Sequence, residues 1–278
     1  MPHHFAPDGA RIAYDNIGTG RPLLLLHGLM AHRGFFARQH ELADAFRLIS
    51  IDLRGHGESR AVGDAPTIEQ LAADVSGLAQ SLDLQDAIGV GWSLGASVLW
   101  HVLTGPAAHR FAGSVVVDMT PRVMNDAHWR LGLSKEACEA RRQAIETDFP
   151  TFATAAGQAI FAPSNADELA DSVRWAGEEF AKNDAAAIST LWTSLVDQDF
   201  RSRLARIAQP TLIIHGAESH LYGADTADYV AAALPNARAI SFDRSGHSPH
   251  FEQAELFNTA VRDFAASLPR VHERPNAA

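Results

Sequence analysis

The sequence predicts an α/β protein built on a doubly wound, mostly parallel sheet with a helical lid insertion. Two observations predict the sheet: short apolar runs of strand length recur along the chain, and longer helical patterns separate them. Several runs are continuous, such as Leu23–Leu26 and Val115–Val117, which is typical of parallel strands covered on both faces. A third observation predicts the insertion, because the alternation stops between residues 121 and 206.

The expected strands share short length and a high content of apolar and β-branched side chains. In chain order they are Arg11–Asn16, Pro22–Leu26, Phe46–Ile51, Ala87–Gly91, Ser114–Asp118, Thr211–His215 and Arg238–Phe242. Helical patterns between and after them lie at Ile68–Leu82, Ser93–Leu103 and Glu252–Leu268. Thr67 stands three residues before Gln70, which is the spacing of a capping box, so the first of these helices is expected to begin there.

Residues 121–206 contain helical patterns and no convincing strand. The patterns lie around Glu136–Thr147, Ala166–Lys182 and Asp184–Leu195. The aromatic residues of this segment are Trp129, Trp175, Trp192, Phe149, Phe152, Phe161 and Phe180. We therefore expect a core domain of residues 1–120 and 207–278 and a helical cap of residues 121–206. The aromatic side chains are expected either to fill the cap's own core or to form one wall of a pocket.

Composition excludes several classes of protein. The 278 residues are 46% hydrophobic and 20% charged, which is typical of a soluble globular protein. The net charge is −10 and no basic stripe occurs, so nucleic-acid binding is not expected. No apolar run is long enough to predict a membrane span. The single cysteine, Cys138, and the lack of a signal-peptide pattern at Met1–Phe5 favour a cytoplasmic location.

Metal-binding motifs are missing from the sequence. Neither His-Glu-x-x-His nor Cys-x-x-Cys occurs among its 14 histidines and its single cysteine. His3 and His4 are expected to belong to a solvated terminus. No metal and no cofactor are therefore expected.

The segment Gly91–Gly95, which reads Gly-Trp-Ser-Leu-Gly, is the most informative motif in the chain. It follows a predicted strand and opens an apolar helix. In that setting Gly-x-Ser-x-Gly predicts a sharp turn that lifts a nucleophilic serine clear of the sheet. The glycines permit close backbone approach, and the N-terminus of the next helix favours developing negative charge. The motif makes Ser93 the candidate nucleophile.

Three further motifs surround this one in a fixed order: Leu26–Leu29, Asp52–Ser59 and Ser245–His247. With them the chain resembles the α/β-hydrolase family over nearly its full length, and within that family it looks like a serine esterase. The resemblance implies the α/β-hydrolase fold.

The resemblance also implies roles for individual residues. His247 would be the general base that takes the proton from Ser93 and returns it to the leaving group. The backbone amides of Leu29 and Leu94 would form the oxyanion hole. His27 and His56 occupy positions that are structural in this family.

The acid of the triad is open between two residues. Most of the family carries it after the strand expected at Thr211–His215, in a His-Gly-x-x-Asp pattern, but here that slot holds Ser219, with Glu218 one residue before. Asp118 instead ends a strand expected beside the nucleophile strand, so it would project from the same sheet edge as Ser93. A subgroup that includes a bacterial acyl-CoA-type esterase and related mitochondrial hydrolases places its acid there, opposite a serine-containing loop. This similarity favours Asp118, with Glu218 as the alternative.

Ser93 occupies the sharp turn at which family members that open epoxides or displace halide have an aspartate. A serine there predicts acyl transfer to serine followed by hydrolysis. The expected substrate is a small-molecule carboxylic ester or thioester with a small to medium apolar acyl group. A lactonase, a carbon–carbon bond hydrolase or a perhydrolase would use the same residues. A ligand receptor on the same fold is the alternative from another class. Arg122 or Arg130 could meet an anionic part of the substrate or could simply be solvated.

Overall fold

The computed structural model describes residues 2–59 and 66–269. Its centre is an eight-stranded sheet in the order β1-β2-β4-β3-β5-β6-β7-β8, with the first two strands antiparallel to their neighbours and the others parallel. This sheet confirms the predicted fold class. The strands are β1 (His3–Phe5), β2 (Arg11–Ile17), β3 (Arg21–Leu26), β4 (Phe46–Ile51), β5 (Ala87–Trp92), β6 (Phe111–Val117), β7 (Thr211–Gly216) and β8 (Ala237–Phe242).

Helices cover both faces of the sheet because the connections change direction. Along the sheet, the connection from β3 to β4 runs in one direction, and the connection from β4 to β5 runs back past β3 in the other. Because both connections are right-handed, their helices lie on opposite faces of the sheet. Accordingly η1 packs with α8 and α9, whereas α1 packs with α2. These helices, together with the remaining ones outside the insertion, are η1 (Arg33–Asp44), α1 (Ile68–Ser81), α2 (Leu94–Leu103), η2 (Pro106–Arg110), η4 (Leu204–Arg206), α7 (Ala224–Ala233), α8 (Pro249–Glu252) and α9 (Ala254–Ser267).

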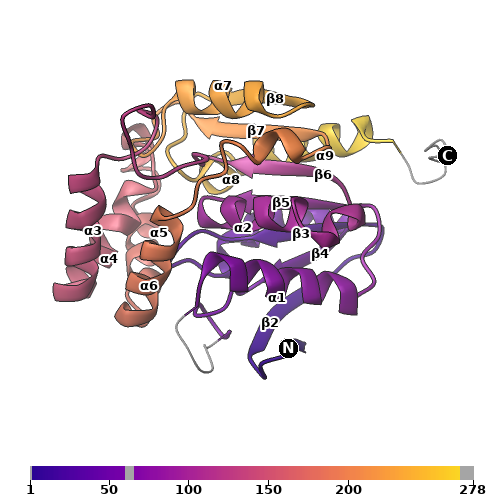
Figure 1. Ribbon diagram of the computed structural model, residues 1–278, viewed down its shortest axis with the longest axis horizontal. Coiled ribbons are helices and arrows are strands. Elements are labelled where there is room, and N and C mark those ends of the chain that lie inside the picture. Colours follow the sequence, from indigo (N-terminus) through magenta and orange to yellow (C-terminus); the bar gives the residue numbers. More distant parts are fainter. Residues whose placement is uncertain (1, 60–65, 270–278) are drawn as a thin grey trace.

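The segment between β6 and β7, all of which the structure describes, contains helices and only isolated β-bridges. Its helices are α3 (Lys135–Thr147), α4 (Phe149–Ala159), η3 (Pro163–Asn165), α5 (Ala170–Phe180) and α6 (Ala185–Val196). Figure 1 shows α3 to α6 at the left, beyond the edge toward which the parallel strands point. They therefore stand over the carboxyl ends of the strands.

The strand order also locates the crevice where a ligand is expected. β3 and β5 are neighbours, but the connection after β3 leads to β4 on one side and the connection after β5 leads to β6 on the other. In open α/β sheets, ligands bind outside the carboxyl ends of the strands at such a switch point. The segments that follow β3 and β5 are the Leu26–Leu29 motif and the Gly91–Gly95 motif. The topology alone thus brings these two motifs together.

Helix boundaries agree with the sequence patterns where a local capping signal was present. Thr67 caps α1, and its Oγ1 accepts a hydrogen bond from the Gln70 amide at 3.3 Å. The helix predicted at Glu252–Leu268 is divided at Gln253, whose backbone angles (φ −121°, ψ 56°) separate α8 from α9. Helices α4 and α7 were not predicted.

The expectation of a solvated N-terminus around His3 and His4 was wrong. These residues belong to β1, which pairs with β2 in the register His3 to Ala13 and His4 to Ile12. A three-residue strand at the edge of a sheet is too short to give a hydrophobic pattern. Its place is fixed by pairing with β2 and not by its own sequence.

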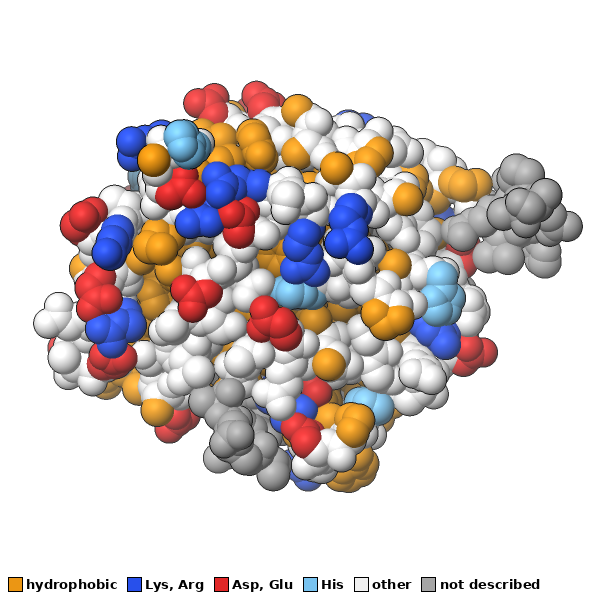
Figure 2. Space-filling view, viewed as in Figure 1, with side chains coloured by type: hydrophobic (Ala, Val, Ile, Leu, Met, Phe, Trp, Pro, Cys, Tyr) orange, Lys and Arg blue, Asp and Glu red, His pale blue; other side chains and the backbone are white. Residues whose placement is uncertain are grey.

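Surface charges of both signs are interspersed on the face shown in Figure 2, with hydrophobic side chains between them and no large basic patch. Within residues 2–59 and 66–269, no helix combines the length and the hydropathy needed to cross a bilayer.

Candidate active site

Backbone strain marks the carboxyl ends of three adjacent strands. Met30, Ser93 and Asp118 have positive φ angles of 66°, 53° and 45°, and they follow β3, β5 and β6. Side chains with a Cβ rarely adopt this conformation, and it persists where the surrounding structure imposes it, often at functional sites. The ladder continues through two of these residues, because the Ser93 amide donates to the Val117 carbonyl (3.0 Å) and the Asp118 amide to the Ile214 carbonyl (2.9 Å). The sheet itself thus holds both side chains at its edge.

The turn at Ser93 needs the glycine on each side of it. A Cβ on Gly91 would lie 2.6 Å from the Cα of Ala96, and a Cβ on Gly95 would overlap the backbone carbonyl of Leu26. The helix α2 therefore begins directly against β3 and β5, with Leu94 as its first residue. The first amides of a helix have no partner inside the helix, so the Leu94 amide is available beside Ser93.

We expect Gly95→Ala to lower the free energy of unfolding by about 3 kcal/mol or more, because the new methyl group overlaps backbone that cannot move away alone. Urea unfolding followed by circular dichroism measures this change. Gly223→Ala is the control, since a Cβ there meets nothing within 4 Å. Unfolding free energies of the two variants within 0.5 kcal/mol of each other, on the scale of ordinary surface substitutions, would contradict the close packing at the turn.

His247 and Asp118 form a buried pair. The Nδ1 of His247 lies 2.6 Å from Oδ2 of Asp118, and the two residues are 3% and 2% exposed. Ser219 donates its hydroxyl to the same Oδ2 at 2.6 Å. A carboxylate on Nδ1 fixes the tautomer of a neutral imidazole and leaves Nε2 free to accept a proton. The structure thus brings together the predicted base, one of the two predicted acids and the serine that occupies the usual position of the acid.

Glu218, the alternative acid, is turned away from His247. Its carboxylate accepts hydrogen bonds from the Ser164 amide (3.1 Å) and the Ser164 hydroxyl. These bonds hold the pKa of Glu218 below its ordinary value. Glu218 therefore binds the insertion, whereas Ser219, the next residue, binds Asp118.

The loop that carries His247 is fixed on two sides. The indole of Trp92, inside the Gly-Trp-Ser-Leu-Gly motif, donates to the His247 carbonyl at 2.7 Å. The Glu252 carboxylate accepts from the Gly246 amide (2.8 Å) and from the Ala162 amide of the insertion (2.6 Å). Burial raises the pKa of Glu252 above its ordinary value, although these hydrogen bonds oppose the shift. Trp92 and Glu252 therefore hold the loop that carries His247, and the sequence motifs did not predict these contacts.

His27 shapes the loop after β3. Burial lowers the pKa of His27 well below its ordinary value, so the ring is neutral. Its Nε2 accepts from the Leu53 amide (2.9 Å), which leaves Nδ1–H to donate to the Gly28 carbonyl (2.8 Å). The Ala31 amide binds that carbonyl too, at 3.2 Å. Because C=O and N–H point in opposite directions in a trans peptide, the Leu29 amide is turned the other way.

The Leu29 amide has no hydrogen-bond partner within the part of the chain that the structure describes. Gly28 lies directly against the nucleophile candidate, since a Cβ on it would be 3.2 Å from the Cβ of Ser93. Leu29 and Leu94, whose amides are the expected oxyanion donors, are thus the residues that follow Gly28 and Ser93, two residues that lie against each other. His56, the other histidine expected to be structural, is buried, and burial lowers its pKa to about 4.

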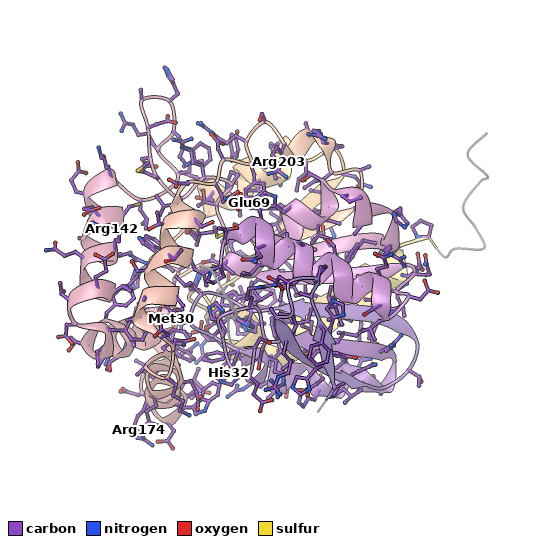
Figure 3. The ribbon with its side chains drawn as sticks, turned by 60° about the horizontal axis from the view of Figure 1, so that its bottom comes forward. Met30, His32, Glu69, Arg142, Arg174 and Arg203 are labelled. Carbon is purple, nitrogen blue, oxygen red and sulfur yellow. The ribbon has the colours of Figure 1, made fainter. Side chains whose placement is uncertain are left out.

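The loop after β3 is tied to the insertion. Asn183, which follows α5, donates its side-chain amide to the Met30 carbonyl at 2.7 Å, and His32 lies 3.3 Å from the Glu179 carboxylate. In Figure 3, Met30 and His32 are labelled where the insertion helices meet the core.

A cavity of about 230 Å³ contains Ser93, His247 and Leu29 in its wall. The remaining wall is mainly apolar and comes from both the core and the insertion: Gly28, Met30, Trp92, Arg141, Phe152, Ala155, Ala156, Ala159, Ile160, Phe180, Trp192, Leu195, Leu221 and Tyr222. No hydrogen bond joins the Ser93 hydroxyl to His247 Nε2 among the described residues, and such contacts are often long before substrate binds. A second, more open groove of about 940 Å³ on α4 and α5 contains neither residue.

The other residues considered from the sequence lie elsewhere. Arg122 is bound to Asp199 (2.6 Å), so its charge is already paired, and neither it nor Arg130 lines the cavity. Among the described residues, no three His, Cys, Asp or Glu side chains gather as a metal-binding group.

The eight-stranded sheet, with the strained serine turn and the buried histidine–carboxylate pair at the carboxyl ends of its strands, has the architecture of a hydrolase-type α/β protein. A model of the alpha/beta hydrolase family matches residues 23–260. The chain belongs to the alpha/beta hydrolase family.

Proteins similar to this chain include several esterases. The pimeloyl-acyl carrier protein methyl ester esterase of Xanthomonas campestris pv. campestris is 31% identical over 262 residues, which are 92% of this chain and 99% of the relative. A thermophilic esterase from Thermogutta terrifontis superposes with a TM-score of 0.84 at 26% identity and covers 94% of this chain and 95% of its own. An esterase from Exiguobacterium antarcticum gives a TM-score of 0.89 at 24% identity, covering 95% of this chain and 99% of its own, and shows the shared fold.

Proposed function

We propose that the protein, a carboxylic ester hydrolase of the alpha/beta hydrolase family, cleaves its substrate through an acyl-enzyme intermediate on Ser93. The observation that carries the proposal is the buried pair of His247 and Asp118, whose imidazole lies in the wall of the same cavity as the strained Ser93. A nucleophile, a base and a group that orients the base are the three parts that serine catalysis needs. The esterases among the relatives support the same class of reaction.

In this mechanism His247 Nε2 takes the proton from the Ser93 hydroxyl as its oxygen attacks the ester carbonyl carbon. Asp118 holds the ring through Nδ1 and stabilises the imidazolium that forms. The Leu29 and Leu94 amides donate to the oxyanion of the tetrahedral intermediate. The intermediate expels the alcohol, which takes the proton from His247. A water molecule, deprotonated by His247, then releases the carboxylic acid and restores Ser93.

Residues 121–206 act in this proposal as a cap over a core of residues 1–120 and 207–278. The insertion contributes Phe152, Phe180 and Trp192 to the cavity wall, opposite the strand ends. Its two connections to the core are joined to each other, because the Phe200 amide donates to the Pro121 carbonyl at 2.8 Å. An apolar acyl or alkyl group of small to medium size would lie against this wall.

A fluorophosphonate probe tests the mechanism directly. We expect peptide mass spectrometry to find the label on Ser93 alone, and we expect the labelled protein to lose its turnover of p-nitrophenyl esters. A panel of esters with acyl chains of different length then defines the acyl group. Label on another residue, or full turnover after labelling, would reject Ser93 as the nucleophile. Acylation without repeated turnover would instead indicate the receptor alternative.

A further inference from the structure

The side chain of an arginine lies in the wall of the mainly apolar cavity. Arg141, on α3, is partly buried, and it is the only acidic or basic side chain among the lining residues apart from His247 and Tyr222. Its guanidinium carbon lies 5.7 Å from the centre of the Trp192 ring, a cation–π distance that holds it against the wall. In the described part of the chain, no carboxylate pairs with Arg141 and no hydrogen bond engages it.

The next residue on the same helix shows the contrast. Arg142 forms ion pairs with Glu139 (2.6 Å) and Glu146 (2.8 Å) on the surface of α3. Figure 3 labels Arg142 at the outer edge of the insertion. Helix α3 thus carries two adjacent arginines. Arg142 is paired with carboxylates on the surface, whereas Arg141 lines the cavity and has no carboxylate partner among the described residues.

Tyr222 supplies a second donor in the wall of the same cavity. Its side chain is buried, its ring centre lies 6.0 Å from that of His247, and its hydroxyl has no hydrogen-bond partner among the described residues. Burial raises the pKa of Tyr222, and the charge of Arg141 is the largest influence that opposes this shift. The tyrosine is therefore a neutral donor within the electrostatic reach of the arginine.

We propose that Arg141 and Tyr222 bind an anionic group of the substrate, so that the enzyme prefers esters that carry a carboxylate. The inference rests on the proposed function and specifies its substrate class. A partly desolvated guanidinium gains most from a charged partner, and its planar fork matches a carboxylate with two hydrogen bonds. The protein as a whole carries a charge of −10, so an anion is not attracted by the overall field and needs a local cation.

Matched ester pairs test this proposal and show which side of the ester bears the charge. Monomethyl adipate against methyl hexanoate places the carboxylate on the acyl side. The butyryl ester of 3-hydroxypropanoate against propyl butyrate places it on the alcohol side. We expect kcat/KM to be at least about 10-fold higher for the charged member of one pair, the size of one charge-assisted contact.

We expect Arg141→Met to remove this preference, with a loss of about 10- to 100-fold on the charged ester and less than about 3-fold on the neutral one. Arg141→Lys should keep part of the preference, because an ammonium retains the charge and loses the bidentate geometry. Arg142→Met, the control on the same helix, should keep the wild-type ratio. Thermal unfolding of each variant checks that the fold is intact.

Equal kcat/KM within both pairs for the wild-type protein would overturn the proposal, as would equal losses on charged and neutral esters in Arg141→Met. Neither outcome would contradict the proposed function. That function is tested separately by the turnover of neutral esters and by the loss of this turnover when Ser93 is replaced. Failure to hydrolyse any neutral or charged ester would count against both.

Discussion

Replacing Ser93 by alanine should lower kcat for ester hydrolysis by a factor on the order of 10⁵. The other hydroxyl in the cavity wall belongs to Tyr222, and a neutral phenol is too weak a nucleophile to replace the serine. The substitution removes one oxygen and keeps the Cβ, so the backbone at φ 53° experiences the same steric constraint as before. We therefore expect the variant to fold and to keep binding the ester. The measurement is kcat for a p-nitrophenyl ester together with the dissociation constant of a non-hydrolysed analogue.

Ser97 provides the matched control for this substitution. It lies on α2 one turn after Ser93, is 1% exposed, and has no hydrogen-bond partner for its hydroxyl among the described residues. Ser97→Ala should therefore leave kcat within about 2-fold of the wild type, since a buried, unbonded hydroxyl contributes little. If Ser93→Ala retained more than about one per cent of the wild-type kcat, the acyl-enzyme mechanism would have to be abandoned.

Replacing Asp118 by asparagine should lower kcat by about 10³- to 10⁴-fold. The amide is nearly the same size, so the cavity is preserved, but a carboxamide neither favours the required tautomer of His247 nor stabilises its charged form. Ser219→Ala removes one hydrogen bond to the same oxygen and should cost far less, about 10-fold. The three proteins are compared by kcat at saturating substrate.

Glu218→Gln is the control for the acid, because its carboxylate binds Ser164 and not His247. We expect its kcat to stay within about 3-fold of the wild type. The opposite pattern, with a large loss for Glu218→Gln and a small one for Asp118→Asn, would assign the acid to Glu218. Equal, small effects for both would leave His247 without a carboxylate partner and would reject a triad.

The fold was predictable because its signals are local and repeated. Continuous apolar runs such as Leu23–Leu26 define strands buried on both faces, and all seven predicted strands overlap strands of the structure. The short edge strand β1 was missed, since strand pairing leaves no periodic pattern in so short a segment, and helices α4 and α7 were missed as well. Tertiary contacts decide such elements.

The candidate site was predictable only as far as its motifs reach. Ser93 and His247 lie in recognisable turns, whereas the contact of Trp92 and the proposed roles of Arg141 and Tyr222 depend on side chains that meet from distant parts of the chain. No spacing in the sequence relates Arg141 on α3 to Tyr222 before α7. The sequence had drawn attention to Arg122 instead, and in the structure that residue is bound to Asp199.

The contacts of Met30 and His32 with the end of α5 have a consequence for engineering. The Leu29 amide, one of the two proposed oxyanion donors, lies one residue before Met30 and three before His32. The contacts that tie the insertion to the core therefore also hold the segment that carries this donor. A chimaera whose exchanged insertion has no amide side chain at the position of Asn183 would lose this bond to Met30 as well as changing the cavity wall. Its turnover number should fall even for esters that fit, and restoring that single asparagine should recover part of it.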